Sequence, residues 1–346
     1  MTRDVQYRVD VIRNGAAFKT LRWQRNDEPR IMFDSEAEIQ ASLSGKFQPD
    51  DEADLLKDEL RAVISVNGEE KSLGIFRVAS LREVRGDGLW LQVEAYDRSW
   101  LLKSARTESL LHLSKGNSYI SAIKALLLQA GIVWVRAVDS SATLAVDRED
   151  WSIGTDLLTI VNELLGEIGY RPVWFDADGW AHLEPYITPS AAHIRHSYGP
   201  ANMRLSRMAS EWEQETDLFN APNVFICVCS NADRSAVLRA VSENTSLSSA
   251  KSIFRRGMRI HDVVKVAQIA DQAALQAYAN KLRDESLLST KTLSFSTPAE
   301  AGHGSGDVIS ISMPGIEGVY KEVSWNLSMA PGAMMNHTAK RTVLDL

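Results

Sequence analysis

Two stretches of the chain alternate hydrophobic and polar residues with a period of two, a pattern typical of half-buried β-strands. In the first stretch the alternation predicts strands over 61–67, 72–81 and 89–97. In the second stretch it predicts strands over 291–298, 307–313, 319–328 and 338–344. Turn signals such as Asn67-Gly68 and Gly86-Asp87-Gly88 bound these runs and favour antiparallel hairpins. The two stretches therefore predict two similar β modules.

The region between the two stretches has a helical period. Apolar residues spaced three and four apart predict helices over 118–130, 154–168 and 269–286. We expect Thr155 to be the N-cap of the second helix. A hairpin is expected over 171–185. The remaining stretches are expected to be irregular over 187–215 and strands over 217–229 and 235–241.

These elements predict an α+β fold that is mostly antiparallel β. Residues 1–105 are expected to form a first small β-barrel. Residues 106–200 are expected to form an inserted mixed α/β module. Residues 201–346 are expected to form a second, similar β-barrel that includes helix 269–286.

Charge and composition narrow the possible partners. The formal net charge is −7, whereas a protein that binds nucleic acid on its surface needs a basic face. The first residues contain no apolar run, so we expect no signal peptide. The chain has no stretch of about 18 apolar residues, so we expect no membrane insertion. Cys227 and Cys229 would share one face of a strand, which is poor geometry for a disulfide, and we expect two small buried thiols.

One acidic run is a candidate for an exposed functional surface. Its six carboxylates are Asp50, Asp51, Glu52, Asp54, Asp58 and Glu59. An EF-hand loop needs a central glycine, and Leu55-Leu56 occupies that place, so a short helix with an acidic first turn is expected instead.

No other pattern predicts a reactive or metal-binding site. His193 and His196 lie three residues apart, but Pro189 and Gly199 near them argue against the helix that would align their rings. The glycine-rich segment 302–307 lacks the Lys-Ser/Thr pair of a P-loop and is expected to be a flexible hairpin tip. We therefore expect no catalytic residues, no cofactor and no metal.

The aromatic residues of the hairpin allow two interpretations. Trp174, Phe175, Trp180 and Tyr186 could form a ligand cage, or they could pack a small sheet against its helices. Packing is the more common role of such residues.

Several short motifs, in a fixed order, carry a family resemblance. They are Ser42–Phe47 followed by Asp54–Arg61, then Val66-Asn67-Gly68, Leu73–Val78, Ala95–Leu102, Phe219–Val224 and Gly306–Ile309. Together they resemble the phage baseplate or tail-tip hub family. This family includes the central hub of contractile-tail baseplates, the hub part of type VI secretion spikes and the N-terminal hub part of siphophage tail-associated proteins.

The resemblance implies a structural protein rather than an enzyme. It implies a homotrimer whose six barrels ring a channel and adapt the six-fold tail tube to a three-fold spike or fibre. The implied partners are other copies of the chain, the tail tube or distal tail protein, the spike or fibre protein and the tape-measure protein, with DNA only in transit. The implied location is the virion tail tip or baseplate, after synthesis in the host cytoplasm.

A lumen that passes DNA should be neutral to acidic, because lysines and arginines there would hold phosphates. The acidic run 50–59 is thus a candidate for the lumen or its rim. Two alternatives remain open: a tail-associated cell-wall hydrolase and a carbohydrate-binding tail adhesin. An adhesin would expose a row of aromatics, for which Trp90, Trp174, Trp180 and Trp325 are the candidates.

Overall fold

The computed structural model describes residues 3–199, 208–215, 222–230, 237–288 and 291–341. The first part of the chain forms β1 (Val5–Arg13), β2 (Ala16–Leu21), β3 (Arg30–Asp34), β4 (Ala41–Phe47), β5 (Glu59–Val66), β6 (Glu69–Arg85) and β7 (Leu89–Tyr96). The middle part forms α1 (Ser99–Ser104), α2 (Tyr119–Gln129), β8 (Val135–Ala137), α3 (Leu157–Glu167), β9 (Trp174–Phe175), β10 (Ala181–Leu183), η1 (Ala191–His193) and β11 (Ile194–Tyr198).

The last part begins with β12 (Trp212–Glu215), β13 (Val224–Cys229), β14 (Leu238–Glu243), α4 (Ile253–Arg256), β15 (His261–Lys265) and α5 (Gln272–Leu288). It ends with β16 (Thr292–Pro298), β17 (Val308–Met313), β18 (Ile316–Ser328) and β19 (Met334–Arg341). The predicted strand positions 217–221, 235–236 and 342–344 lie outside the described residues.

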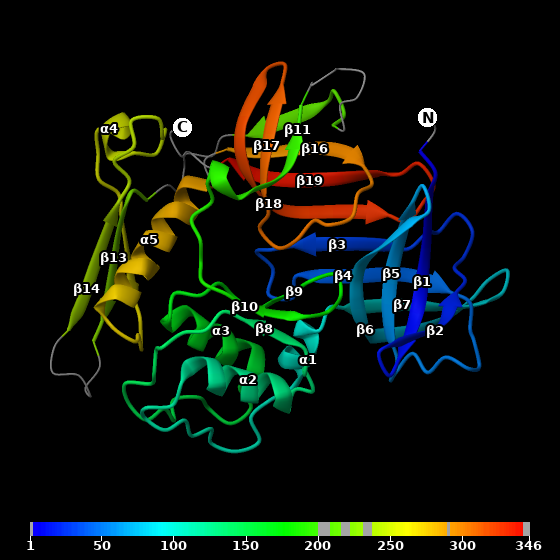
Figure 1. Cartoon of the computed structure of the whole chain (residues 1–346), viewed down its shortest axis with the longest axis horizontal. Coiled ribbons are helices and arrows are strands. Elements are labelled where there is room, and N and C mark those ends of the chain that lie inside the picture. The colour runs from blue at the N-terminus through cyan, green and yellow to red at the C-terminus, as the bar shows by residue number, and fades with distance from the viewer. Residues whose placement is uncertain (1–2, 200–207, 216–221, 231–236, 289–290, 342–346) are drawn as a thin grey trace.

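One large sheet of 13 strands joins the two ends of the chain (Figure 1). Its strand order is β12-β16-β19-β18-β3-β4-β7-β6-β5-β1-β2, with β17 beside β18 and β11 beside β17. Most neighbours are antiparallel, and β11 runs parallel to β17. The mostly antiparallel α+β fold expected from the sequence is confirmed.

The expectation of two closed barrels is not confirmed, because the two predicted β modules share one sheet. β3 pairs with β18 in antiparallel register, and Phe33 lies opposite Trp325 with their rings stacked at a centroid distance of 5.8 Å. This pairing satisfies the backbone groups that two separate modules would leave exposed at their edges. At the far end of the sheet, β2 pairs with β1. The chain that follows β2 turns back toward β4, where Trp23 and Phe47 form an isolated bridge.

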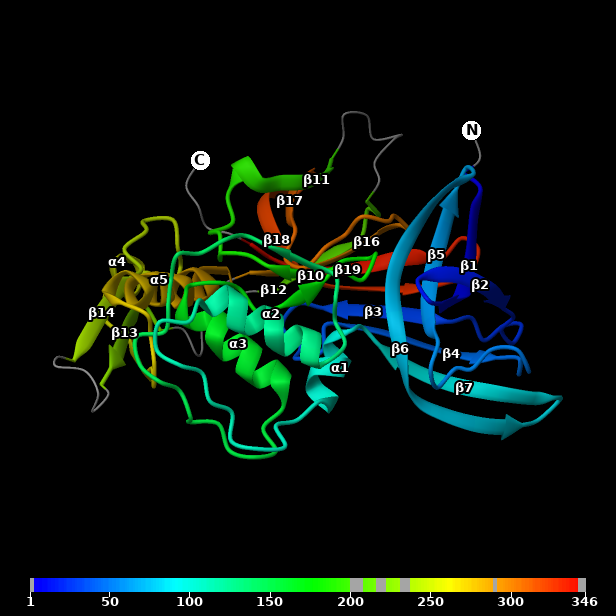
Figure 2. The same cartoon turned by 60° about the horizontal axis from the view of Figure 1, so that its bottom comes forward.

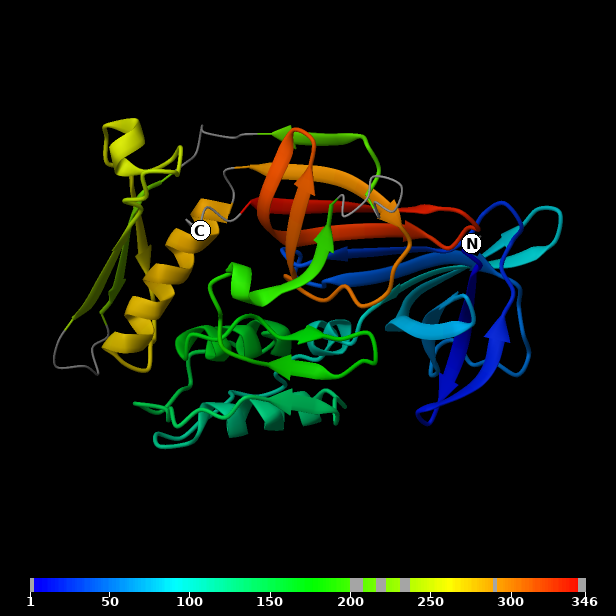
Figure 3. The same ribbon diagram turned by 45° about the horizontal axis from the view of Figure 1, so that its top comes forward.

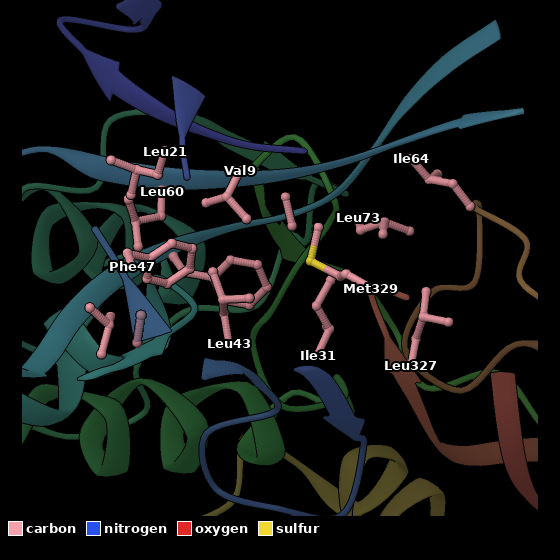
Figure 4. Close-up of a cluster of buried hydrophobic side chains, with 14 of the residues drawn as sticks. Val9, Leu21, Ile31, Leu43, Phe47, Leu60, Ile64, Leu73, Leu327 and Met329 are labelled. Carbon is pink, nitrogen blue, oxygen red and sulfur yellow. The ribbon is translucent and has the colours of Figure 1, made fainter. Parts of the chain in front are cut away.

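The core under the first half of this sheet also contains residues from the last strands. Val9, Ile31 and Leu43 are fully buried there, and Leu327 and Met329 complete the same cluster (Figure 4). Burying a side chain of this size contributes about 1.5–3 kcal/mol. The packing of the first 100 residues therefore depends on residues more than 200 positions away in the chain.

The middle of the chain forms an α/β layer beneath the large sheet (Figure 2). β8, β10 and β9 form a small sheet, and α2 and α3 bury their apolar faces in a common cluster with it. The predicted helices here are confirmed to within three residues, and Gly131 and Gly169 follow them with positive φ values of 83° and 74°. The N-cap of α3 is Asp156 rather than Thr155, because the Asp156 carboxylate accepts the backbone N–H of Thr159 at 2.9 Å.

A third unit lies at one side of the molecule, away from the N-terminal strands (Figures 1 and 3). Strands β14, β13 and β15 form its sheet, and α5 packs on that sheet over Leu275 and Ala279. Cys227 and Cys229 are both thiols outside any disulfide and are fully buried in this cluster, as expected. The predicted helix 269–286 is Gln272–Leu288, shifted by two to three residues.

Two further expectations are corrected. The acidic run 50–58 forms turns, not a helix, and Glu59 begins β5. Residues 187–215 are not wholly irregular, since β11 and β12 lie within them and both pair with distant strands. Over the part of the chain that the structure describes, no helix combines the length and apolar character needed to cross a membrane.

Candidate functional site

The six acidic candidates lie together in the segment that leads into β5, but most of their charge is neutralised. Lys19 pairs with Asp50 and Glu52, each at 2.7 Å, and Arg13 pairs with Asp58 at 2.6 Å. The hydrogen bond from Arg13 holds the pKa of Asp58 below its usual value.

The other three acidic candidates differ in their surroundings. Glu59 pairs with Arg98 at 2.7 Å, and Asp54 pairs with Lys57 at 3.4 Å. Asp51 is exposed, and no described cation lies within ion-pair distance of it. The segment is therefore a turn held by ion pairs, and among its six carboxylates Asp51 alone is exposed and has no described ion-pair partner.

The outer part of the β6–β7 hairpin, over residues 80–94, projects from the rest of the large sheet, and we call it the β6–β7 arm (Figure 2). β5 pairs with β6 over residues 69–77, so the outer edge of β6 over 80–85 has no described strand partner. Leu81 and Leu89 on this arm are 39% and 47% exposed. A two-stranded ribbon is only marginally stable by itself. Its exposed apolar residues and unpaired edge offer a surface on which another strand can pair.

A cavity of about 560 Å³ lies between the α/β layer, α5 and strands β18 and β19. Five cations line it, namely Arg171, Arg195, Lys281, Lys321 and Lys340, together with the carboxylates Glu36, Glu184, Glu285 and Asp307. Each of these carboxylates lies within 4 Å of a lysine or arginine. The general acid of a glycoside hydrolase needs an apolar setting, which this cavity does not give them.

The aromatic candidates do not form an exposed row. Trp174, Phe175 and Trp325 are buried, each at most 9% exposed. Trp180 is partly buried and lies against Trp134 with ring centroids 5.4 Å apart, and Arg136 covers its face at 4.7 Å. Packing of the small sheet is thus the confirmed interpretation for Trp174 and Phe175.

A buried cluster of histidines and a carboxylate lies among the last strands. Its centre is Glu322 on β18, and His337 reaches it from the neighbouring strand β19. His303 reaches it from the loop between β16 and β17. The side chains of all three residues are at most 1% exposed. We name these three residues the His–Glu–His cluster.

The cluster is closely hydrogen-bonded. His303 Nδ1 lies 2.8 Å from one Glu322 oxygen, and His337 Nδ1 lies 2.5 Å from the other. The second ring nitrogens also have partners: Thr297 Oγ1 lies 2.8 Å from His337 Nε2, and Tyr198 Oη lies 3.3 Å from His303 Nε2. Burial alone would raise the pKa of Glu322, but the two histidines outweigh it and lower that pKa to about 2.

Aromatic stacking fixes both imidazole rings. The His337 ring stacks on Phe295 with centroids 4.8 Å apart, and the His303 ring stacks on His196 with centroids 4.2 Å apart. His196 Nε2 lies 3.6 Å from Asp307 Oδ2, and this carboxylate raises the pKa of His196. The cluster thus has fixed rings and an ionised carboxylate, which are the elements of a metal site.

Sequence reasoning missed this cluster and considered His193 and His196 instead. His193 bonds to Ser190 and does not join the cluster, whereas His196 lies beside it. The segment 302–307 does connect two strands, but the His303 side chain points into the interior rather than lying at an exposed tip. The available signal was a charged residue, Glu322, at a buried position of a predicted strand.

Comparison with known proteins gives matches in structure alone. No family model and no curated protein matches the sequence. The tail protein from Neisseria meningitidis MC58 aligns with a TM-score of 0.67 and 16% identity over 97% of each chain. The 43 kDa tail protein of prophage MuSo2 from Shewanella oneidensis aligns with a TM-score of 0.68 and 10% identity over 98% of each chain.

A type VI secretion system component from E. coli, described as structurally similar to bacteriophage T4 tail proteins, aligns with a TM-score of 0.51 and 12% identity. That alignment covers 99% of this chain and 77% of the other. The resemblance to tail and hub proteins noted in the sequence is therefore confirmed at the level of the fold.

Proposed function

We propose that this chain is a structural hub subunit of a phage tail tip or baseplate. The observation that carries the proposal is a fold shared with two tail proteins, one of them from a prophage, over nearly the whole of all three chains. A fold can host several functions, so it matters as well that the carboxylates around the 560 Å³ cavity are paired with cations, a setting that does not suit the general acid of a glycoside hydrolase. Both observations favour a structural subunit whose role is to assemble with other proteins.

The proposed assembly is a homotrimer that adapts a six-fold tail tube to a three-fold spike or fibre. Residues 1–105 and 201–346 would each contribute one β module to a ring of six, and residues 106–200 would form the inserted α/β module. The β6–β7 arm supports this assembly, because its free edge and exposed leucines fit a neighbouring copy of the chain. The arm has no described strand of its own chain to complete its edge.

The other proposed partners follow from the position of a hub. They are the tail tube or distal tail protein on one side, the spike or fibre protein on the other, and the tape-measure protein with DNA in transit through the channel. The acidic turn 50–59 is proposed to lie at the channel or its rim, where Asp51 offers an unpaired carboxylate. An acidic wall repels phosphates and lets DNA pass.

The oligomeric state tests the proposal directly. Light scattering of the purified full chain should give three copies per particle. Leu81→Glu on the arm should yield folded monomers, whereas Leu128→Glu, at an exposed position of α2, should leave the trimer intact. A wild-type monomer at every concentration, or a trimer insensitive to Leu81→Glu, would count against the proposed interface.

The proposal also includes a non-enzymatic role. The full chain should clear no more peptidoglycan in a zymogram than buffer does. Clearing that disappears when one cavity carboxylate, such as Glu184, is changed to its amide would favour a cell-wall hydrolase instead.

A further inference from the structure

We propose that His303, Glu322 and His337 form a binding site for one divalent transition-metal ion, with Zn²⁺ the best match to this ligand set. Two imidazoles and one carboxylate are the protein ligands of a common class of zinc site. The proposal departs from the sequence-based expectation of no metal, and it does not depend on the assembly proposed above.

The ligand atoms are already gathered. One atom from each residue lies within 4.8 Å of the others, and both histidines present Nδ1 to Glu322 at 2.5–2.8 Å. With bonds of about 2.1 Å to zinc, ligands in a tetrahedral site lie about 3.4 Å apart. Placing an ion between the three side chains therefore requires the nitrogen–oxygen separation to widen by about 0.6 Å at His303 and about 0.9 Å at His337, and the two ring nitrogens, which lie within 4.8 Å of each other, to settle about 3.4 Å apart.

The outer hydrogen bonds are compatible with the tautomer that metal binding needs. Ligation through Nδ1 requires the ring proton on Nε2, which must then find an acceptor. Thr297 Oγ1 faces Nε2 of His337 and Tyr198 Oη faces Nε2 of His303. A hydroxyl can donate or accept, so both partners serve the metal-bound tautomer as well as the metal-free one.

Burial gives a second argument. The Glu322 carboxylate is fully buried, and the ion-pair partners described for it are the two histidines alone. The buried carboxylate of Glu167, by contrast, is paired with the permanently charged guanidinium of Arg148 at 2.7 Å. A divalent cation between the three side chains would give Glu322 a permanent counter-charge of the same kind.

His196 is not part of the proposed ligand set. Its ring lies nearly parallel to that of His303, at an interplanar angle of 11°. A ring nitrogen binds a metal in the plane of its ring, so nitrogens of two stacked rings do not converge on one ion. His196 therefore holds the His303 ring in place, and side-chain exposure of at most 1% at the three ligands closes the site to bulk solvent.

The first experiment measures metal content. The full chain is stripped with EDTA, loaded with ZnCl₂, desalted and analysed by mass spectrometry for zinc per chain. One zinc per chain is expected, together with a rise in melting temperature. Co²⁺ in place of zinc should give the visible absorption of a tetrahedral nitrogen and oxygen site. No retained zinc and no thermal shift would overturn the proposal.

Variants locate the ion. Glu322→Gln keeps the shape and removes the charge. Its amide oxygen still accepts from one ring, and its amide N–H donates to the other ring, whose proton moves to Nε2, so the variant should fold and lose stoichiometric zinc. Thr297→Val removes a hydroxyl that positions His337 and should weaken zinc binding by about 10- to 100-fold. His261→Ala, at an exposed position of β15, is the matched control and should bind as wild type does. A folded Glu322→Gln that binds zinc like wild type would overturn the site.

A measurement on the wild type covers the case in which the variants fail to fold. X-ray absorption of the zinc-loaded chain should show two imidazole ligands and one carboxylate oxygen. Fewer than two imidazoles would contradict the assignment, whatever the variants do.

Discussion

At the scale of single residues, buried charged side chains form ion pairs in the interior of the protein. In the α/β layer Arg148 and Glu167 lie 2.7 Å apart with side chains 3% and 7% exposed. Burial raises the pKa of Glu167, against the opposing effect of Arg148. Tyr119 also donates its hydroxyl to this carboxylate at 2.8 Å. The guanidinium is thus the main group that makes the buried carboxylate tolerable.

Arg148→Met should therefore destabilise the protein strongly. Methionine fills much of the space but leaves Glu167 buried without a cation, at a cost of about 3–5 kcal/mol. The free energy of unfolding from urea titration measures this. Arg136→Met is the control, because Arg136 is 56% exposed and its contacts, with Asp176 at 3.3 Å and with the face of Trp180, are each worth about 1 kcal/mol or less. Equal losses in the two variants would contradict the role given to Arg148.

The two cysteines should be unreactive in the folded protein. Burial raises the pKa of the Cys227 thiol to about 11, so its thiolate is scarce at pH 8, and both sulfur atoms are inaccessible. A chromogenic disulfide reagent should label neither thiol in buffer and two per chain in denaturant. Rapid labelling of the native chain would show that the β13–β15 unit opens.

At the scale of elements, capping residues and bulges determine where helices begin and which strand faces are buried. Along β18 the buried positions change from even-numbered residues, such as Tyr320 and Glu322, to odd-numbered ones, such as Trp325 and Leu327. The change falls at the register shift between Glu322 and Ser324. A bulge of this kind places Glu322 in the interior beside His337.

The N-cap of α3 provides a test at this scale. Asp156→Ala removes the acceptor for the backbone N–H of Thr159 and should cost about 0.5–2 kcal/mol, read from urea unfolding. Asp156→Asn retains a capping oxygen and should lose only the contact with the partly exposed Lys103, worth about 0–1 kcal/mol. Identical losses for the two variants would mean that the ion pair, rather than the cap, stabilises this helix start.

At the scale of the whole molecule, the first and last strands fold as one body. Trp325, Leu327, Met329 and Met335 lie in the same buried cluster as the core of the first seven strands. The α/β layer, by contrast, has a cluster drawn from residues 101–183, with Ala270 packed at its edge.

Fragments should therefore differ in stability. A fragment of residues 1–105 lacks the β18–β19 side of its core and is expected to show no cooperative unfolding transition. A fragment of residues 99–186 contains nearly all of its own cluster and is expected to unfold cooperatively. Circular dichroism during urea titration compares the two. A cooperative transition in the first fragment would show that the shared core is dispensable.

The sequence by itself determined the local helices and strands and much of the resemblance to tail and hub proteins. Period-two alternation and the 3.6-residue period are local properties, so the strands of the last module and helices α2, α3 and α5 could be predicted to within a few residues. The order of short motifs also indicated the tail and hub fold that structural comparison confirms.

The tertiary structure decided which strands and side chains become neighbours. The β3–β18 pairing merges two modules that the sequence pattern predicts as separate, because edge strands pair through backbone groups that every residue type except proline presents alike. The same holds for the His–Glu–His cluster. Its members come from a loop and two strands, and each is isolated in the sequence. A local pattern cannot encode such contacts, since they depend on register and on a bulge that exist only once the sheet has formed.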